Sequence, residues 1–577
     1  MDSRNTIIAI LVSIAILLGW DLFFAKKVAP PVEQPAATAA APTAPGDLAQ
    51  PAVAAPAATA PAADAAPEAA PAPRVRVTTP HVHGSIALTG ARLDDITLAN
   101  YRVGLDPTTP EITLLAPANA PKPSYAEWGW LASDTGVTVP GPTTVWTAAT
   151  PDQPLTDTQP LVLTWDNGQG LVFTRTIRAD KEYLFTIEQG VTNNSERAVN
   201  LYPYSLVTRL DGSSESGLGM AYLGPIGVFE QQLKEVKYDD LKEKGRQTFE
   251  STAAWIGISD HYWLTAVAFE PTVKVSGSFN YASPNGRDRF QTDLRADPIS
   301  VAPGETKTTK SYVFAGAKEL NLLDEYRETL GLPLFDRAID FGWYWFLTIP
   351  FFQILRFLNA ALGNVGLAIL GLAFIVRLLM FPIANKQFNT MNKLKKLQPE
   401  MKRLQERFAN DRPKLNQELM DLYKREKANP LAGCLPILIQ IPVFYALYKV
   451  LSVTIEMRHA PFYGWIHDLS APDPTSVLNL FGLLPFQIPA FLAFVSIGAW
   501  PLLMGITMYI QQKLSPQPAD PMQAKIMMLM PIIITFVLAP YAAGLVIYWA
   551  WSNTLGILQQ WVLLKRGERQ DAKASTS

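Results

Sequence analysis

A single arginine stands inside an apolar stretch, "LAFIVRLLMFP" at residues 372–382. A positive charge in hydrocarbon costs about 2.5–3.5 kcal/mol even on insertion-based scales. In trapped water, the Arg377 guanidinium could attract a carboxylate or donate hydrogen bonds to the carbonyls of an extended chain. The side chain could instead reach the nearer interface, since it lies roughly 10 Å from the end of the apolar run. The residues alone leave both interpretations open.

Other polar and aromatic side chains interrupt the apolar segments that follow Arg377. Such side chains can line a hydrophilic groove, but serine, threonine, asparagine and glutamine also form hydrogen bonds between packed helices. Tyr548 and Trp549 could contact a passing helix or anchor the protein at the membrane interface. The candidates for a groove that receives a substrate are Arg377, Gln440, Thr507, Thr535, Tyr548, Trp549, Ser552 and Asn553.

The sequence gives little support to covalent or metal chemistry. It contains no G-x-x-x-x-G-K-[ST] phosphate loop, which argues against an ATP-driven pump. His81 and His83, in "HVH", would share one face of a strand and could hold a metal ion, or could be two unrelated polar positions. We favour unrelated positions. We therefore expect a protein that is not an enzyme and has no catalytic residues, no metal and no small-molecule cofactor.

Five apolar segments must position the candidate groove residues. At a rise of about 1.5 Å per residue, about 22 residues span roughly 33 Å, which is enough for the hydrocarbon core of a bilayer. An earlier apolar run at residues 5–24 has no small-x-small cleavage site close behind it, so we expect an uncleaved anchor rather than a signal peptide. The six predicted spans are 5–24, 362–383, 431–452, 491–512, 523–540 and 542–563.

A further apolar stretch, at residues 335–358, is expected to lie in the plane of the membrane interface. Pro350 and Arg356 interrupt it, and the aromatic cluster "WYW" that begins at Trp343 is typical of the boundary between lipid and water. Its later part is amphipathic, as interfacial helices are. If this stretch crossed the membrane, every later loop would change sides.

Basic residues in the short loops predict the orientation of the chain. Residues 384–427 contain twelve lysines and arginines, whereas residues 453–490 contain one, Arg458, and the turn at 540–544 contains none. Short basic loops remain in the cytoplasm. We therefore expect the basic loop and both termini inside, and the region between residues 28 and 318 outside.

The basic loop has a helical pattern of its own. Apolar residues recur every three or four positions from Phe388 to Phe408, "NDRP" at 410–413 breaks the pattern, and leucines then resume it. We expect a helical hairpin at 384–428. Its charges could form a solvated face or a docking surface for an acidic or ribonucleic partner. The candidate docking residues are Lys393, Lys395, Lys396, Lys402, Arg403 and Arg407.

The region before the membrane core divides into a linker and a β-rich domain. Residues 28–73 contain 21 alanines and 11 prolines, lack the large apolar groups of a core and are expected to form a flexible tether. From 75 to 318, runs such as "LVFTRTIR" and "YLFTIEQG" place β-branched and aromatic residues between turn residues. These runs are too many for one small sheet, so we expect a large all-β sandwich of two sheets.

The composition narrows the class of protein. The net charge is −2 and 17% of residues are charged, so there is no global basic excess of the kind that indicates nucleic-acid binding. Cys434 is the sole cysteine, which excludes an intrachain disulfide. Two rival functions stay open. A small-molecule transporter suits six spans and a buried charge, although no clear internal repeat is visible, and an anchored sugar-binding or sugar-modifying enzyme would rest on the β-sandwich.

Several motifs, in order along the chain, resemble the YidC family of bacterial membrane-protein insertases. The resemblance is dense over residues 335–565, whereas the anchor, the tether and the β-rich domain resemble the Gram-negative form more loosely. The stretch 478–500 is longer than the family pattern, so the resemblance does not fix where the 491–512 span begins. The motifs are "FIVRLLMFP", "LQPEMKRLQERF", "YKREKANPLAGCLPILIQIPVFYALY", "APFYGWIHDLSAPDP", "DPMQAKIMMLMP" and "GLVIYWAWSNTLGILQQ".

The resemblance implies five core helices around a hydrophilic groove that is open to cytoplasm and lipid and closed to the outside. It implies that Arg377 projects into this groove. The implied activity is the insertion and folding of inner-membrane proteins, alone or with the Sec translocon. The implied partners are nascent membrane proteins, the Sec translocon, membrane lipid and, through the cytoplasmic loops and tail, the ribosome.

Taken together, these patterns predict a multi-pass protein of the bacterial inner membrane with a helical membrane core and a large periplasmic all-β sandwich. The predicted parts are an anchor at 1–27, the linker at 28–73, the β-sandwich at 75–318, a linking helix and interfacial helix at 319–360, the membrane core at 361–565 and a basic tail at 566–577.

Overall fold

The computed structural model describes residues 73–134, 136–212, 221–408, 411–426, 435–484, 496–514 and 521–574. The expected anchor at 1–27, the linker at 28–72 and the last residues of the tail lie outside the described residues. Residues 431–434 and 491–495, where two of the expected spans begin, also lie outside them.

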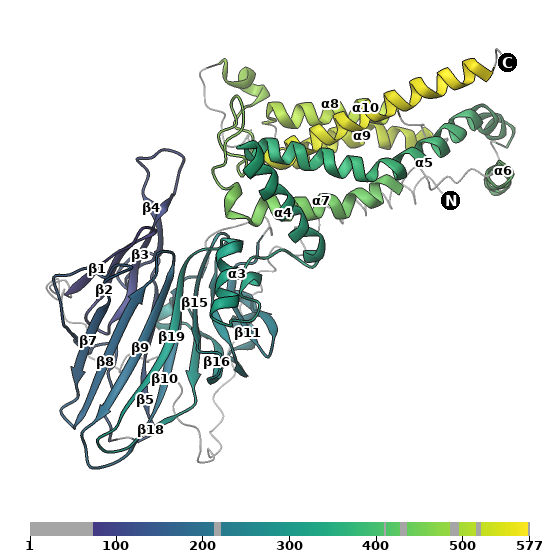
Figure 1. Ribbon diagram of the computed structural model, residues 1–577. Helices are drawn as coiled ribbons and strands as arrows, with labels where there is room; N and C mark the ends of the chain where they lie inside the picture. The colour runs from purple at the N-terminus through teal and green to yellow at the C-terminus, as the bar shows by residue number, and fades with distance from the viewer. Residues whose placement is uncertain are drawn as a thin grey trace. The chain divides into compact units, whose positions relative to one another are not determined.

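The β-rich domain contains two sheets whose strands pair antiparallel (Figure 1). The first sheet has ten strands in the order β1-β2-β3-β5-β10-β17-β16-β13, with β4 beside β3 and β18 beside β10. Its strands are β1 (Arg74–Thr78), β2 (Val82–Ala87), β3 (Arg92–Arg102), β4 (Glu111–Leu115), β5 (Ser124–Ala132), β10 (Val199–Leu210), β13 (Gln247–Thr252), β16 (Lys274–Ala282), β17 (Arg289–Ala296) and β18 (Ile299–Val301).

The second sheet has nine strands in the order β12-β11-β14-β15-β19-β9-β8-β7-β6. A short helix, α2 (Tyr238–Lys244), follows β12. The strands of this sheet are β6 (Thr147–Ala148), β7 (Leu161–Asp166), β8 (Leu171–Ala179), β9 (Leu184–Asn193), β11 (Gly224–Phe229), β12 (Gln232–Glu235), β14 (Trp255–Ser259), β15 (Trp263–Phe269) and β19 (Thr306–Ala317).

One continuous core lies between the two sheets, and large aromatic side chains fill much of it. Trp128 of the first sheet and Trp255 of the second are fully buried, and Trp146 joins them from the segment before β6. Alternate residues of a strand point to the same face, so each strand contributes every second side chain to this core. Leu171, Phe173 and Ile177 of β8 follow this rule.

The same alternation places an arginine in the core. Arg175 of β8 is buried, and its guanidinium lies 4.1 Å from the ring centroid of Trp146. The side chain donates to the carbonyl oxygens of Gly90 at 3.1 Å and Trp128 at 2.8 Å. Burial lowers the pKa of Arg175 to about 10. The cation thus ties the second sheet to the first through backbone acceptors.

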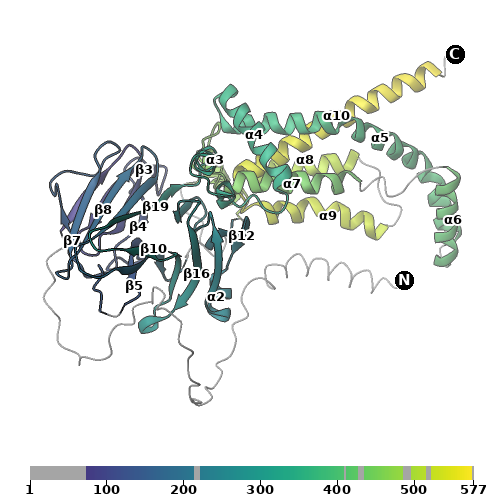
Figure 2. The ribbon, with the colours of Figure 1, turned by 60° about the horizontal axis from the view of Figure 1, so that its bottom comes forward.

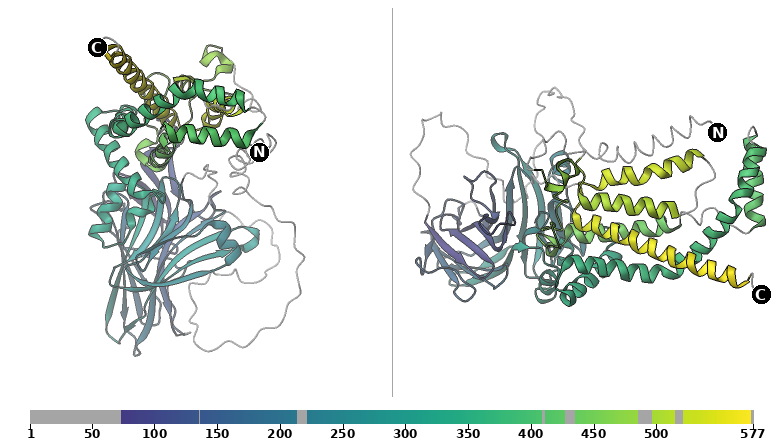
Figure 3. Two further views of the ribbon diagram at one scale, coloured as in Figure 1. Left: turned by 90° about the vertical axis from the view of Figure 1, so that its right-hand side faces the viewer. Right: turned by 90° about the horizontal axis from the view of Figure 1, so that it is seen from above.

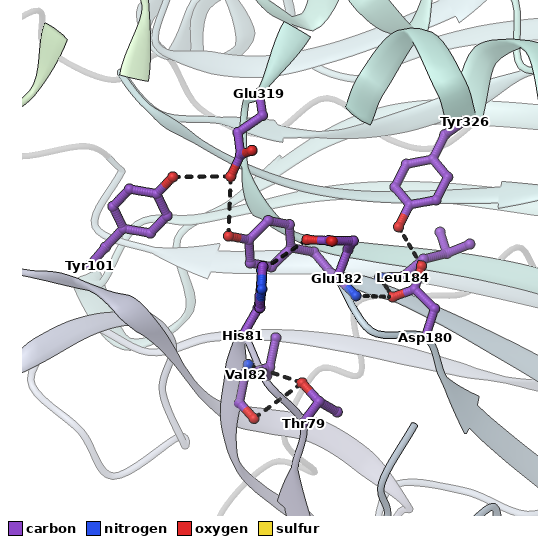
Figure 4. A network of polar contacts seen from close by, with 10 residues as sticks. Thr79, His81, Val82, Tyr101, Asp180, Glu182, Leu184, Glu319 and Tyr326 are labelled. Carbon is purple, nitrogen blue, oxygen red and sulfur yellow. Dashed lines mark hydrogen bonds and ion pairs between the residues drawn. The ribbon is translucent and has the colours of Figure 1, made fainter. Parts of the chain in front are cut away.

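A polar network joins the β-rich domain to the helix that follows it (Figure 4). Glu319 precedes α3 (Leu320–Thr329), and its Oε1 accepts hydrogen bonds from the hydroxyls of Tyr101 at 3.0 Å and Tyr183 at 3.3 Å. Within α3, the Tyr326 hydroxyl donates to Asp180, the residue that follows β8. The start of α3 and its last turn are therefore both fixed to the β-rich domain, at β3 and at the turn between β8 and β9.

This network predicts a loss of stability at alkaline pH. Burial, together with the nearby Glu319, raises the pKa of Tyr101 and Tyr183 above the ordinary value of about 10. Above that pH, the unfolded state gives up the phenolic protons more readily than the folded state, so the free energy of unfolding falls as pH rises. We expect the melting temperature of the β-rich domain to be independent of these tyrosines' protonation below about pH 10 and to fall as pH rises above it. The Tyr101→Phe variant should show a shallower fall, and an equally steep fall would contradict the assignment.

The C-terminal part is helical, and its helices contact one another side by side (Figure 2, Figure 3). Between α3 and α4 lies a 3-10 turn at Phe335–Ala338, and others follow α7 at Ile455–Met457 and Val477–Gly482. The helices are α4 (Trp345–Leu362), α5 (Val365–Arg407), α6 (Arg412–Arg425), α7 (Leu435–Val453), α8 (Ala499–Leu514), α9 (Pro521–Leu538) and α10 (Ala543–Ala574).

Two helix boundaries differ from the expected spans. The span expected at 362–383 and the first arm of the hairpin form one helix, α5, of 43 residues. In the described part of the span expected at 491–512, residues 496–498 are not helical and α8 begins at Ala499. Asp473 and Thr475 explain this start: their side-chain oxygens accept hydrogen bonds from the backbone N–H groups of Trp500 at 2.8 Å and Ala499 at 3.0 Å.

Candidate functional site

Arg377 of α5 is directed toward α10, whereas the two residues that follow it in the chain are exposed. The Asn364 side chain caps the helix by accepting a hydrogen bond from the Leu367 N–H at 3.0 Å. Leu378 and Leu379, next to the arginine, are 62% and 68% exposed, as expected of side chains that face lipid. Arg377 itself is half-buried, and its Nε donates to the Ser552 hydroxyl of α10 at 3.2 Å. Its Nε is therefore bonded to a neighbouring helix, and the side chain does not follow the lipid-facing residues.

A second polar link joins α10 to α7. The Gln440 Nε2 donates to the Tyr548 hydroxyl at 3.2 Å. Tyr548 is 2% exposed, so its hydroxyl needs a partner inside the protein. Tyr548 lies four residues before Ser552, which places both side chains on one face of α10. This face therefore carries the contacts to α5 and α7.

A third polar link joins α10 to α8. The Asn553 Nδ2 lies 3.4 Å from the Thr507 Oγ1, and Thr507 in turn donates to the backbone oxygen of Met504 at 2.9 Å. Asn553 is 4% exposed. Three polar side chains of α10 thus contact three different helices, and α10 organises the candidate site.

Thr535 and Trp549 occupy other positions. The Thr535 hydroxyl donates to the Pro531 backbone oxygen of its own helix at 2.8 Å and lies against Gly505 of α8. Trp549 packs on Phe444 of α7, with ring centroids 4.6 Å apart. These contacts are with neighbouring helix residues and involve neither Arg377 nor Ser552.

Two residues close to Arg377 were not predicted from the sequence. Gly556 of α10 is buried one turn beyond Ser552, and a Cβ at this position would lie 3.2 Å from the Arg377 Nη2 and 2.9 Å from the Gln511 Nε2. Gln511 of α8 therefore also approaches the site. The pair "QQ" at 511–512, at the end of an apolar helix, is a signal that could have identified Gln511. A glycine gives no such signal without a structure.

The basic hairpin forms two helices, α5 and α6, that contact each other. The Arg425 Nη2 of α6 lies 2.7 Å from the Glu400 Oε1 of α5. Asp411 caps α6 by accepting from the Lys414 N–H at 3.1 Å. The side chains of Lys393, Lys395 and Lys396 lie outside the described part of the chain, and those of Lys402, Arg403 and Arg407 are exposed.

The two histidines near the start of the β-rich domain contact separate carboxylates. The His81 Nδ1 lies 2.8 Å from the Glu182 Oε2, and the His83 Nδ1 lies 3.2 Å from the Glu111 Oε2. Figure 4 shows His81 beside Glu182. Among the residues that the structure describes, no group of three histidine, cysteine, aspartate or glutamate side chains has the arrangement of metal ligands.

Two of the described helical segments are long and apolar enough to cross a membrane, Trp345–Leu362 and Val365–Asn385. The second contains Arg377. The first is the stretch that the sequence assigns to the interface plane, and its length and composition fit either placement. Gln440–Val453 and Lys525–Leu538 are shorter apolar helices.

Comparisons with known proteins cover nearly the whole chain. The family described as "60Kd inner membrane protein" matches residues 357–570, and the "YidC periplasmic domain" family matches residues 74–354. "Membrane protein insertase YidC" of Sinorhizobium medicae is 46% identical, covering 98% of this chain and 96% of the relative. The protein of the same name from Methylorubrum extorquens is 43% identical, covering 98% and 95%. A crystal structure described as an active YidC insertase with its first transmembrane domain resolved matches with a TM-score of 0.36 and 16% identity, covering 85% of this chain and 92% of that one.

These matches define a class: an inner-membrane protein with a helical membrane core and a large periplasmic β-sandwich, as the sequence predicted. Within that class, the chain belongs to the YidC family of membrane protein insertases. The resemblance seen in the motifs is thereby confirmed.

Proposed function

We propose that this protein inserts and helps to fold inner-membrane proteins, and that the polar cluster around Arg377 receives the polar part of each substrate. One observation carries the proposal. A half-buried arginine within an apolar helix bonds to Ser552, on a helix that also contacts α7 and α8 through polar side chains.

The physical problem is that a substrate with one membrane helix and a polar tail faces two barriers. The tail must cross hydrocarbon, where unsatisfied polar groups are costly, and the helix must leave water. A polar cluster partway through the membrane shortens the first barrier. The Arg377 guanidinium can attract a carboxylate or bond to the carbonyls of an extended tail. Transfer of the apolar helix to lipid then drives release, at roughly 25 cal/mol per Å².

This route needs no covalent bond to the substrate and no nucleotide, so we propose that the protein acts as a binding and guiding surface rather than as an enzyme. Several polar donors and acceptors that tolerate varied chains suit a protein with many substrates. Arg377, Gln440, Thr507, Tyr548, Ser552 and Asn553 are proposed to line the path. Thr535 and Trp549 are proposed to shape it by supporting α9 and α7.

The proposed partners follow from charge and position. Exposed Lys402, Arg403 and Arg407 on the hairpin suit an acidic or ribonucleic surface, which supports the ribosome as a partner together with the basic tail. Alone or beside the Sec translocon, the protein would receive nascent membrane proteins from the cytoplasm and release them to lipid. The division into anchor, linker, β-sandwich, interfacial helix, core and tail is proposed to serve this one-way path.

The test of the proposed function is reconstitution. Purified protein in liposomes should insert a single-span substrate without nucleotide or other proteins. Liposomes that contain a boiled sample should not. Transport of a defined small solute without insertion of the substrate would favour a transporter instead. Sugar binding or sugar modification by residues 75–318 alone would favour an enzyme in the β-sandwich.

The proposed orientation gives a further prediction. The twelve basic residues at 384–427 should keep this loop in the cytoplasm. A reporter fused near residue 410 should therefore behave as cytoplasmic, and a reporter fused near residue 300 should behave as exported. An exported reporter at 410 would invert the core and contradict the proposal, because Arg377 would then be reached from the outside.

A further inference from the structure

We propose that Gly556 is a positioning residue: its missing side chain leaves the space in which the Arg377 guanidinium is held between α5, α8 and α10. The inference rests on the proposed function, because it concerns the same arginine. It adds a residue that carries no polar group and that no substrate needs to touch.

The geometry begins with the direction of the arginine. Its Nε is 3.2 Å from the Ser552 hydroxyl, and its Nη2 is 3.2 Å from the point where a Cβ of residue 556 would lie. Residues 552 and 556 are one helical turn apart on one face of α10. The guanidinium therefore extends along that face by one turn, from Ser552 to Gly556.

A second side chain meets the same point from α8. The same Cβ would lie 2.9 Å from the Gln511 Nε2, closer than real contacts of this kind. Gly556 thus stands where polar side chains from two other helices converge on α10. Glycine in a helix interior costs about 1 kcal/mol relative to alanine, so its presence at a buried site calls for a local reason. The approach of Arg377 and Gln511 supplies that reason.

The consequence concerns where the charge is held. A methyl group at 556 would push the Nη2 of Arg377 and the Nε2 of Gln511 by a few tenths of an ångström, which two flexible side chains can absorb. A branched side chain would fill the space and displace the guanidinium from the face of α10. The hydrogen bonds of a planar guanidinium depend more on its position than those of a compact ammonium do. The added side chain should therefore lower insertion more when residue 377 is arginine than when it is lysine.

The experiment compares Gly556→Ala and Gly556→Val in the reconstituted insertion assay, with Gly544→Ala as the matched control. Gly544 is a buried glycine of the same helix, and its added Cβ would meet Leu469 and Ile369 rather than Arg377. We expect Gly556→Val to lower the insertion rate about tenfold and Gly556→Ala about twofold, the scale of overpacking at a tight contact. Gly544→Ala should stay within about twofold of the unchanged protein.

Combined variants separate positioning from general disturbance. With Arg377→Ala, the change Gly556→Val should cause no further loss, because the displaced group is already absent. With Arg377→Lys, the change Gly556→Val should cost clearly less than it does with arginine. Equal losses in all three backgrounds, or full activity of Gly556→Val, would overturn the inference.

Two readouts keep the result interpretable. If Gly556→Val lowers the melting temperature and reduces the amount of the protein in the membrane enough to account for the lower insertion rate, the positioning role is overturned in favour of a structural role. If Arg377→Ala is fully active, the proposed function of the arginine fails first, whatever Gly556 does. If Arg377→Ala is inactive while Gly556→Val is fully active, only the role of Gly556 fails.

Discussion

Arg377→Ala is expected to reduce the insertion of a single-span substrate with an acidic tail by about tenfold to a hundredfold. Hydrogen bonds that involve a charged group contribute about 1.5–3 kcal/mol, and about 1.4 kcal/mol corresponds to a factor of ten. The Nε of this charge donates to Ser552 of α10, and under the proposed function the tail of the substrate binds beside it. Alanine removes both the charge and the donor fork.

Two further variants divide this effect. Arg377→Lys keeps the positive charge and should keep part of the insertion activity. The activity that it loses measures the contribution of the paired N–H donors of the guanidinium. Ser552→Ala removes the hydroxyl that accepts from the Arg377 Nε and should give a smaller loss than Arg377→Ala. A substrate with a neutral tail should depend less on Arg377 than one with an acidic tail. Full activity of Arg377→Ala with acidic tails, at normal protein levels, would remove the arginine from the mechanism.

The second large effect concerns stability and involves an ion pair at the far end of α7 from Gln440. The Lys449 Nζ lies 2.7 Å from the Asp340 Oδ2, and the side chains are 7% and 22% exposed. Asp340 also accepts hydrogen bonds from the backbone N–H groups of Tyr222 at 3.0 Å and Gly342 at 2.9 Å. The pair therefore fixes the segment before α4 to α7.

Asp340→Ala is expected to lower the free energy of unfolding by about 3–5 kcal/mol, because it leaves the Lys449 ammonium buried without this carboxylate. The measurement is denaturant unfolding in detergent, followed by tryptophan fluorescence. The control is the double variant Asp340→Leu with Lys449→Met, which removes both charges and should recover the part of the loss that comes from the uncompensated ammonium, but not the part from the Tyr222 and Gly342 N–H groups. A single variant as stable as the unchanged protein, or a double variant less stable than either single change, would contradict this account of the pair.

The sequence predicted the architecture well because the relevant signals are long. Alternating β-branched residues over many segments indicated a two-sheet sandwich, and runs of apolar residues with basic loops indicated a helical membrane core. The boundaries were harder to predict. The start of α8 depends on Asp473 and Thr475, which cap it from a loop more than twenty residues earlier, and no local pattern reports such a contact.

In the candidate site, the sequence identified several of the polar residues, but only the structure shows which helices they contact. Arg377, Ser552 and Tyr548 were visible as polar residues in apolar segments. Which helices they would meet could not be predicted. Arg175 illustrates the limit in the β-sandwich: the alternation of β8 puts it on the core face, but its partners there, the backbone oxygens of Gly90 and Trp128 and the ring of Trp146, could not be predicted.

The most direct test of the central claim is site-specific photo-crosslinking to a nascent chain stalled during insertion. One crosslinker replaces Gln511, which approaches the Arg377 cluster, and a matched one replaces Leu379, which is 68% exposed on the outer side of α5. The account predicts that the polar tail of the substrate crosslinks at 511 and not at 379, and that Arg377→Ala lowers the yield at 511. Equal yields at both positions, or a yield at 511 that does not respond to Arg377→Ala, would contradict it.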